Sequence, residues 1–257
     1  MEVHHHSHTP RKKQTHYFWE FLMLFLAVFC GFLAENQREH YIENQRAKQL
    51  AKNLYKELYA DSASMAQIIL NRHNKEREAQ YFVDYVKDSD LVNLSPRFFP
   101  SFVMALIQIQ YIIFEPSDGI LNQLRNSGEL RYFKSSELQT EIGKLGVKIS
   151  HLRTRNEREY SYIETYSRPF ILKHMDFEWY ETFTRRGTIL LVEALKSAHL
   201  GTTGRLSNAE SFSRGEAQSL TSYYLLLLRS TRQIQYREYA EANHRVLELL
   251  RKEFHLE

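Results

Sequence analysis

The chain has 257 residues, and its 34 lysine and arginine residues nearly balance 31 aspartate and glutamate residues. The first sixteen residues contain three of the basic and one of the acidic residues, which leaves 31 basic against 30 acidic residues in the remainder. This balance argues against a nucleic-acid-binding domain, which concentrates lysine and arginine on one surface. The single cysteine, Cys30, excludes an intrachain disulfide.

The first sixteen residues are rich in histidine and include a basic cluster, residues 11–13. Imidazole nitrogens are good ligands for zinc, copper or nickel, and the candidates here are His4, His5, His6 and His8. An ordered metal site also needs supporting residues around the ligands, and a short tail does not provide them. We therefore expect adventitious metal binding only, and no cofactor.

Residues 18–34 form an apolar run that predicts a membrane anchor. Seventeen helical residues cover about 25 Å, slightly less than the hydrocarbon core of about 30 Å. Tyr17 and Trp19 can extend the span as interfacial aromatic residues. A helix buried in a soluble core would show a polar face, and between Phe21 and Ala34 there is none. The predicted membrane segment is residues 17–35.

The anchor does not contain a recognisable cleavage site. A signal peptidase requires small residues at positions −3 and −1, but Ala34 at −1 would place Phe32 at −3. A lipoprotein signal requires a small residue before its cysteine, whereas Cys30 follows Phe29. The sequence therefore predicts an uncleaved signal anchor.

The charges that flank the anchor give its expected orientation. The basic cluster precedes the span, although Arg38, Arg46 and Lys48 follow it and weaken the contrast. Long domains are translocated with little regard to their own charge. We expect a single-pass protein of the inner membrane, with residues 1–16 in the cytoplasm and residues 36–257 in the periplasm.

One face of the anchor is suited to contact between helices. Its members follow the spacing of a single helical face: Glu20, Leu24, Ala27, Gly31 and Ala34. Ala27 and Gly31 are small residues four positions apart, which lets two backbones approach closely. The pattern predicts a homo-oligomer formed through the membrane helix. Glu20 is costly in a bilayer unless it reaches the interface or contacts another polar group.

The body of the chain shows helical periodicity throughout. Residues 34–95 contain no glycine or proline, and their apolar residues recur every three, four or seven positions. Arg72 and Glu76 interrupt this stripe, so a helix in a bundle is favoured over a strict coiled coil. Pro96 and Pro100 predict a break, which is followed by a buried core helix over residues 102–114.

The central and C-terminal parts contain further helix signals. Asp118 can cap a short helix, residues 120–127, which Gly128 ends in a left-handed conformation. Ser136 and Gln139 form a capping box that opens a helix running to Ser167. Arg168 and Pro169 should break or kink that helix, and Gly143 and Gly146 within it indicate close packing.

Three further segments complete the prediction. Residues 171–200 should form one or two helices with a break around Arg186 and Gly187, and residues 201–215 should form an exposed loop. Residues 216–254 should form a final long helix. The predicted fold is all-α, with an N-terminal transmembrane helix that continues into a bundle of long helices.

Two blocks carry a resemblance to a known family. The first is the histidine-rich, basic N-terminus with the span ending GFLAENQRE (residues 31–39), and the second is EPSDGILNQLRNSG (residues 115–128), continuing through Leu130 and Arg131. These blocks resemble a family of uncharacterised membrane proteins of Bacteroidota. The resemblance implies a single-pass inner-membrane protein without an established activity. Glu129 departs from the pattern, which has a second glycine there.

The second block is the candidate site in the body of the chain. Its central turn block comprises Asp118, Gln123, Asn126, Gly128 and Arg131. Five polar residues of this region could line a surface for an acidic or glycan-like ligand, or could simply cap and fix the turn around Gly128: Asn122, Gln123, Arg125, Asn126 and Arg131. Four C-terminal tyrosines could form an aromatic ligand box, but their helical spacing favours packing: Tyr223, Tyr224, Tyr236 and Tyr239.

The sequence contains no GxSxG, Walker, HExxH, CxxC or dinucleotide-binding motif, so we expect no enzyme. Two functions remain. One is a membrane-anchored scaffold that contacts the lipid bilayer, its own copies and an unidentified envelope protein. The other is an extracytoplasmic sensory or ligand-binding domain that signals through a partner. A solid apolar core with an exposed apolar stripe would favour the scaffold, and a buried polar pocket with converging charges would favour the sensor.

Overall fold

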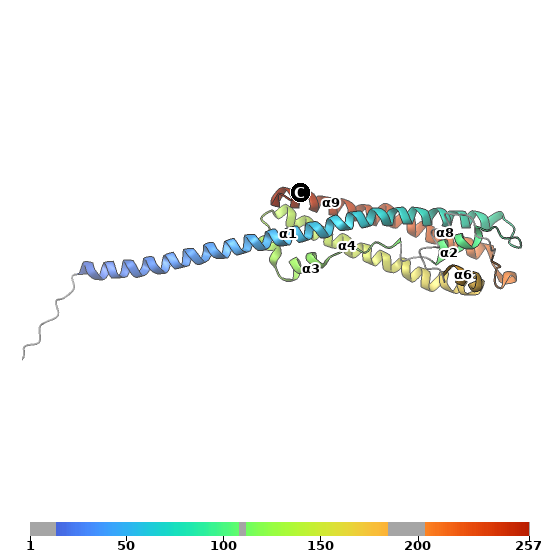
Figure 1. Ribbon diagram of the computed structural model, residues 1–257, viewed down its shortest axis with the longest axis horizontal. Helices are drawn as coiled ribbons and strands as arrows, with labels where there is room; N and C mark the ends of the chain where they lie inside the picture. The colour runs from blue at the N-terminus through green and yellow to red at the C-terminus, as the bar shows by residue number, and fades with distance from the viewer. Residues whose placement is uncertain (1–13, 108–111, 185–203, 257) are drawn as a thin grey trace, which may run out of the picture. The chain divides into compact units, whose positions relative to one another are not determined.

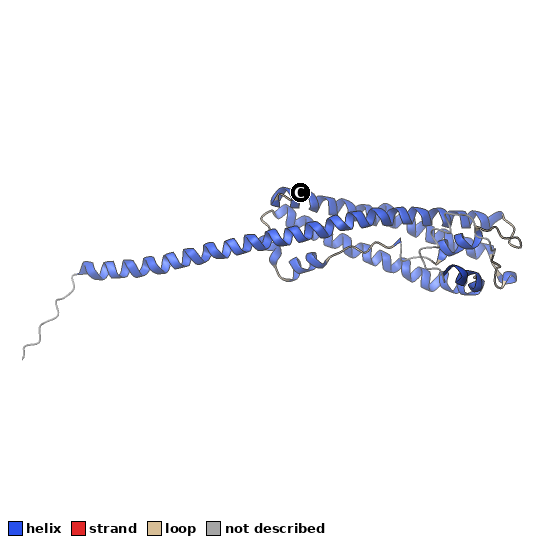
Figure 2. Cartoon of the chain, viewed as in Figure 1, coloured by secondary structure: helices blue, strands red, loops and turns tan. Residues whose placement is uncertain are grey.

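The computed structural model describes residues 14–107, 112–184 and 204–256. Within these ranges the chain is helical and contains no strand (Figure 2). The chain divides into two units, residues 1–50 and residues 51–257. The predicted all-α fold is confirmed for the described residues.

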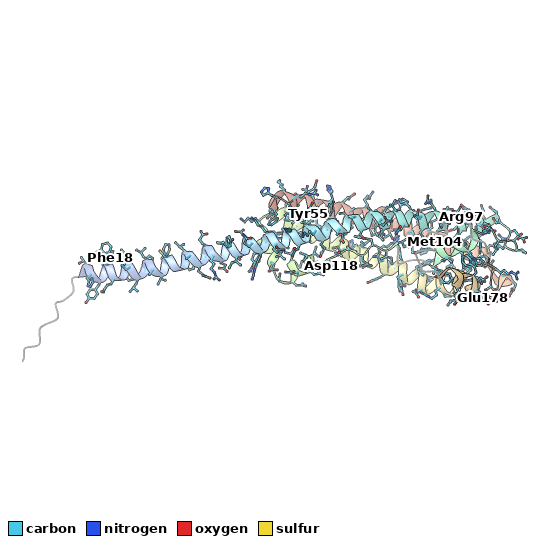
Figure 3. All side chains as sticks on the ribbon, in the orientation of Figure 1. Phe18, Tyr55, Arg97, Met104, Asp118 and Glu178 are labelled. Atoms are coloured by element: carbon cyan, nitrogen blue, oxygen red, sulfur yellow. The ribbon has the colours of Figure 1, made fainter. Side chains whose placement is uncertain are left out.

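Helix α1 (Gln14–Asp88) begins with the predicted anchor. The apolar side chains of that segment are exposed, including Phe18, which is labelled in Figure 3 and is 60 % exposed. A Cβ atom on Gly31 would meet no atom within 4 Å. Among the described residues, α1 is the one helix long and apolar enough to cross a membrane. The expected candidate membrane helix near the N-terminus is therefore present.

From Ala51 onward, α1 is part of a helical bundle. It lies beside α4 (Ser136–Tyr162), α8 (Arg214–Ser230) and α9 (Arg237–Phe254) (Figure 1). Leu54 and Leu58 of the predicted apolar stripe are fully buried. The Asn243 side chain donates a hydrogen bond to the Leu58 carbonyl over 3.0 Å, which joins α9 to α1. The stripe thus faces the bundle core, as its periodicity predicts.

Helix α2 (Phe98–Leu106) is buried over its whole length. Its aromatic side chains pack on α1 and on α6 (Phe177–Thr184), with ring centroids 5.3 Å apart for Phe82 and Phe102 and 5.2 Å apart for Phe99 and Trp179. The core position of this segment is confirmed, but the predicted boundaries of residues 102–114 are wrong. Beyond residue 112 the backbone is not helical, because its polar groups bind side chains of other helices, as described below.

Two π-helical turns keep long helices continuous where α-helical bonding changes. The turn η3 (Ile163–Ser167) joins α4 to α5 (Arg168–His174), and η5 (Thr231–Tyr236) joins α8 to α9. Pro169 has no N–H, and the π turn before it accommodates the lost bond, so the expected break becomes a change of helix type. The final long helix is confirmed with η5 as an unpredicted turn within it.

The remaining connections refine the prediction. Ser135, rather than Ser136, caps α4, and its Oγ accepts the Leu138 N–H over 3.1 Å. A break separates α5 from α6, and the predicted break at residues 186–187 lies outside the described residues. Gly204 is buried against Phe99 and Trp179, so the predicted exposed loop is partly wrong there. Two short 3-10 turns complete the described elements: η2 (Glu129–Tyr132) and η4 (Ala209–Ser211).

Candidate functional site

A buried ion pair joins α1 to α4 at the centre of the bundle. Nη2 of Arg72 lies 2.7 Å from Oε1 of Glu159, Nη1 lies 3.2 Å from Oε2, and both side chains are fully buried. The guanidinium also donates to the carbonyl oxygens of Ile112 (3.2 Å) and Leu228 (3.1 Å). Burial alone would lower the pKa of Arg72, but the nearby Glu159 carboxylate raises it above its usual value. The Arg72 guanidinium therefore stays charged inside the bundle.

The π turn η5 completes the surroundings of this pair. The hydroxyl of Thr231, its first residue, is hydrogen-bonded to Glu159, and the hydroxyl of Tyr236, its last residue, accepts from Nη1 of Arg72 over 3.2 Å. Tyr236 also donates to the Ile112 carbonyl (3.0 Å) and accepts the Phe114 N–H (3.1 Å). A π turn adds a residue to the helical register, and here both of its ends face the ion pair.

A second cation lies three residues beyond Arg72 on the same helix. Lys75 is fully buried, and its Nζ atom is 5.0 Å from the centroid of the Tyr224 ring. Burial, reinforced by the charge of Arg72 and opposed by Glu159, lowers the pKa of Lys75 to about 7. The core of the unit therefore holds two basic groups, Arg72 and Lys75, together with the buried Glu159 carboxylate.

Glu76 adds a second ion pair at the edge of this cluster. Its two carboxylate oxygens each lie 2.9 Å from a guanidinium nitrogen of Arg232, which belongs to η5. In the sequence, Arg72 and Glu76 are charged residues that interrupt the apolar stripe of α1. The structure shows that they form the polar centre of the bundle, which sequence reasoning missed. Their position on the apolar stripe was the available signal.

The segment 113–118, here called the strap, crosses the bundle beside this network. Asp61 of α1 accepts the Ser117 N–H over 2.9 Å and the Ser117 hydroxyl over 2.8 Å. The same carboxylate accepts the Tyr239 hydroxyl over 2.7 Å. Glu57, one turn earlier, accepts the Ile120 N–H at 3.4 Å, and burial raises the pKa of Glu57. Two carboxylates of α1 thus fix the strap and the start of α3 (Gly119–Asn126).

Helix α4 holds the strap from its other side. Nη1 of Arg153 lies 2.6 Å from Oδ2 of Asp118, and this hydrogen bond holds the pKa of Asp118 below its usual value. Asn156 donates to the Phe114 carbonyl (3.0 Å) and to Glu115 (2.9 Å). Asp118 occupies the predicted N-cap position of α3, but its side chain makes no capping bond. That part of the prediction is wrong, because the carboxylate binds Arg153 instead.

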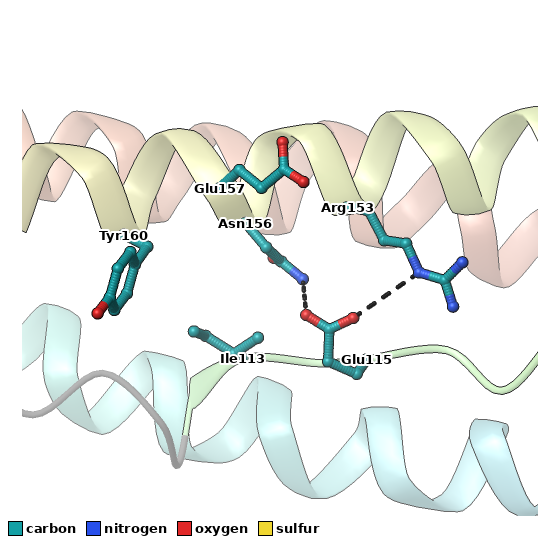
Figure 4. Close-up of a pocket in the computed structure, with 6 residues that line it drawn as sticks. All are labelled: Ile113, Glu115, Arg153, Asn156, Glu157 and Tyr160. Carbon is teal, nitrogen blue, oxygen red and sulfur yellow. Dashed lines mark hydrogen bonds and ion pairs between the residues drawn. The ribbon is translucent and has the colours of Figure 1, made fainter.

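A cleft of about 370 Å³ lies between the strap and α4. Figure 4 shows Ile113 and Glu115 of the strap opposite the side chains of Arg153, Asn156 and Tyr160. Dashed lines mark the contacts from Glu115 to Asn156 and to Arg153, the second an ion pair of 3.9 Å. Glu115 therefore already binds two of the polar side chains that line this cleft.

The rest of the predicted central turn block makes local contacts. Gln123 donates to Glu129 over 3.3 Å, and Arg131 lies over the Tyr132 ring at 5.2 Å from its centroid. Asn126 is exposed, and Gly128 has the predicted left-handed conformation with φ of +72°. Asp118 faces α4, so the structure does not bring these residues together with it. The carboxylate of Glu129 also accepts the Ser127 hydroxyl over 2.9 Å.

The structure describes the four C-terminal tyrosines but not the four N-terminal histidines. Tyr224, Tyr236 and Tyr239 are fully buried, which fits the packing role, whereas Tyr223 is 50 % exposed beside Tyr162. The candidate metal ligands lie outside the described residues: His4, His5, His6 and His8. Among the described residues, no group of three histidine, cysteine, aspartate or glutamate side chains could hold a metal ion.

Comparisons with protein-family models, with curated proteins and with solved structures found no match.

Proposed function

We propose that this protein is a membrane-anchored helical scaffold or interaction protein of the cell envelope, without enzymatic activity. The observation that supports this function is the composition of α1 along its length. The helix begins with an exposed apolar segment and continues, without an interruption in the described residues, into the buried stripe of the bundle. One helix thus serves both as the anchor and as a principal core element.

The proposed location is the inner membrane. Three features of the sequence support it: the basic cluster before the anchor, the absence of a cleavage site and the resemblance to a membrane protein family of Bacteroidota. In this arrangement residues 1–16 lie in the cytoplasm, residues 17–35 span the bilayer and residues 36–257 are periplasmic. The partners are the lipid bilayer, further copies of the chain and an unidentified envelope protein.

Self-association through the anchor is the first testable part of the proposal. Glu20, Leu24, Ala27, Gly31 and Ala34 are all exposed in the structure, so this face is open to a second helix. In a Cys30→Ala background, full-length protein with Ala27→Cys should form disulfide-linked dimers when membranes are oxidised. Phe29→Cys, on the opposite side of the helix, is the matched control and should crosslink much less.

A second variant tests whether the small residue itself matters. Gly31→Leu adds a bulky side chain to the proposed contact face and should at least halve the crosslinking yield at Ala27→Cys. Equal yields at positions 27 and 29, or an unchanged yield with Gly31→Leu, would contradict association through this face. Blue-native electrophoresis of the same membranes gives an independent measure of oligomeric state.

The second candidate function is a sensory or ligand-binding domain. The buried charges converging from α1, α4 and η5 favour it, because Arg72 and Lys75 belong to the helix that also contains the anchor. A rearrangement of this network would act directly on α1. The two functions differ in one requirement, since a sensor must bind a ligand in residues 51–257 and a scaffold need not.

A further inference from the structure

Arg125 is a cation that the fold positions without an ion-pair partner in the part of the chain that the structure describes. It lies on α3, and its guanidinium is placed over Gly146 of α4, where a Cβ atom would come within 2.8 Å of Nη1. Gly146 therefore makes room for this side chain, as the predicted close packing of that glycine requires. Gly143 has no neighbour within 4 Å of an added Cβ, so the same prediction is wrong there. Among the described residues, Arg125 makes no hydrogen bond or ion pair.

A groove of about 330 Å³ lies beside this guanidinium, between α3 and α4. Its lining includes potential hydrogen-bond donors from both helices, namely Asn122, Arg125, Ser150 and Thr154. The volume is within the range of small-molecule sites in proteins. Ser150 follows Gly146 by four residues, so it lies one helical turn further along the same face of α4.

Of the two arginines that line the groove, Arg125 is the one without an ion pair among the described residues. Arg153 is neutralised by Asp118 at 2.6 Å and also donates to the Pro116 carbonyl at 3.3 Å. Glu157, which has no ion pair among the described residues, also lines the groove. It lies eleven residues beyond Gly146, or about 16 Å along the axis of α4. This axial spacing is longer than the Debye length of about 8 Å in physiological salt, so the Glu157 charge acts only weakly at the position of Gly146.

We infer that this groove is a binding site for a small organic anion, whose carboxylate or phosphate group is held by Arg125. A guanidinium presents a planar set of N–H donors that matches both oxyanions, and hydroxyl and amide groups supply further donors. The inference goes beyond the scaffold function and does not depend on self-association of the anchor. It names the ligand class that a sensory function would use.

The test is calorimetric titration of full-length protein in nanodiscs of zwitterionic lipid at physiological ionic strength. The probes are succinate, inorganic phosphate and glycerol 3-phosphate, with glucose as the neutral control. At least one anion should bind with a dissociation constant of about a millimolar or tighter, and glucose should not bind. Binding to succinate alone would assign a carboxylate ligand, and binding to both phosphates would assign a phosphate. Binding to glycerol 3-phosphate alone would point to a lipid headgroup.

Two variants connect the binding to the groove. Arg125→Gln should weaken anion affinity by about tenfold or more, because a charge-assisted hydrogen bond is lost. Gly146→Ala should also weaken it, because the new methyl group displaces the guanidinium. Arg158→Gln is the control. It removes an exposed arginine of α4 that does not line the groove, and it should leave the affinity unchanged. Absence of anion binding by the wild-type protein, or equal affinity in Arg125→Gln and Arg158→Gln, would overturn the inference.

Discussion

Glu159→Ala is expected to destabilise the helical unit by about 3–5 kcal/mol, the largest effect of any single substitution considered for this chain. The variant leaves Arg72 fully buried without its carboxylate, while Lys75 stays buried nearby. It also removes one of the hydrogen-bond partners of Thr231 in η5. A buried guanidinium without its carboxylate is far less favourable than an ion pair, because it does not recover its hydration. Chemical denaturation of full-length protein in detergent, followed by circular dichroism, measures the change.

Two controls separate loss of charge compensation from loss of packing. The double variant Arg72→Met/Glu159→Leu removes both charges and keeps apolar volume, so it should be considerably more stable than Glu159→Ala. Glu164→Gln breaks the exposed pair with Arg168 and should have little effect on stability. If the single and double variants were equally unstable, the buried pair would not be the cause.

The second large effect is a rise in stability with pH that depends on Lys75. Its pKa is about 7 in the folded protein and 10.5 in its ordinary state. Below pH 7 both folded and unfolded chains hold the proton, and the folded chain bears the full cost of the buried charge. Between pH 7 and 10.5 the unfolded chain binds more protons, so the free energy of unfolding should increase with pH. Over the full range from pH 7 to 10.5, the free energy of unfolding should increase by roughly 5 kcal/mol.

Lys75→Met isolates this contribution from other titrating groups. The variant should be more stable than wild type at pH 6 and should lose most of the rise between pH 7 and 10. Measurements above pH 10 are less useful, because burial raises the pKa of Tyr236 and of Tyr239, and their titration then destabilises the folded state. Parallel pH profiles for the variant and the wild type would refute the assignment to Lys75.

Periodicity predicted the elements of this fold better than it predicted their boundaries. The spacing of Leu54 and Leu58 indicated the buried face of α1, and Gly128 indicated a left-handed turn. The end of α2 could not be read in the same way. The carbonyl of Ile112 and the N–H of Phe114 bind Arg72 and Tyr236, which lie 40 and 122 residues away, respectively. No local pattern reports such long-range partners.

The candidate sites illustrate the same limit. The sequence indicated Asp118 and its neighbours as a candidate site. It could not show that the Asp118 carboxylate would bind Arg153 instead of capping α3. It also could not pair Arg72 with Glu159, because the two residues are 87 positions apart. Charged residues on an otherwise apolar helical face are nevertheless visible in a sequence. In this chain Arg72 and Glu76 show that pattern, and both are buried in the bundle.

The central claim, an uncleaved anchor with the helical unit outside the cytoplasm, is tested most directly by fractionation with protease accessibility. The full-length chain is expressed with different epitopes at its two ends in host cells, and spheroplasts are treated with protease. Without protease, both epitopes should stay with the membrane after alkaline extraction. In protease-treated spheroplasts, only the C-terminal epitope should be removed. Release of a shorter, soluble chain that has lost its N-terminal epitope, or protection of the C-terminal epitope in spheroplasts, would contradict it.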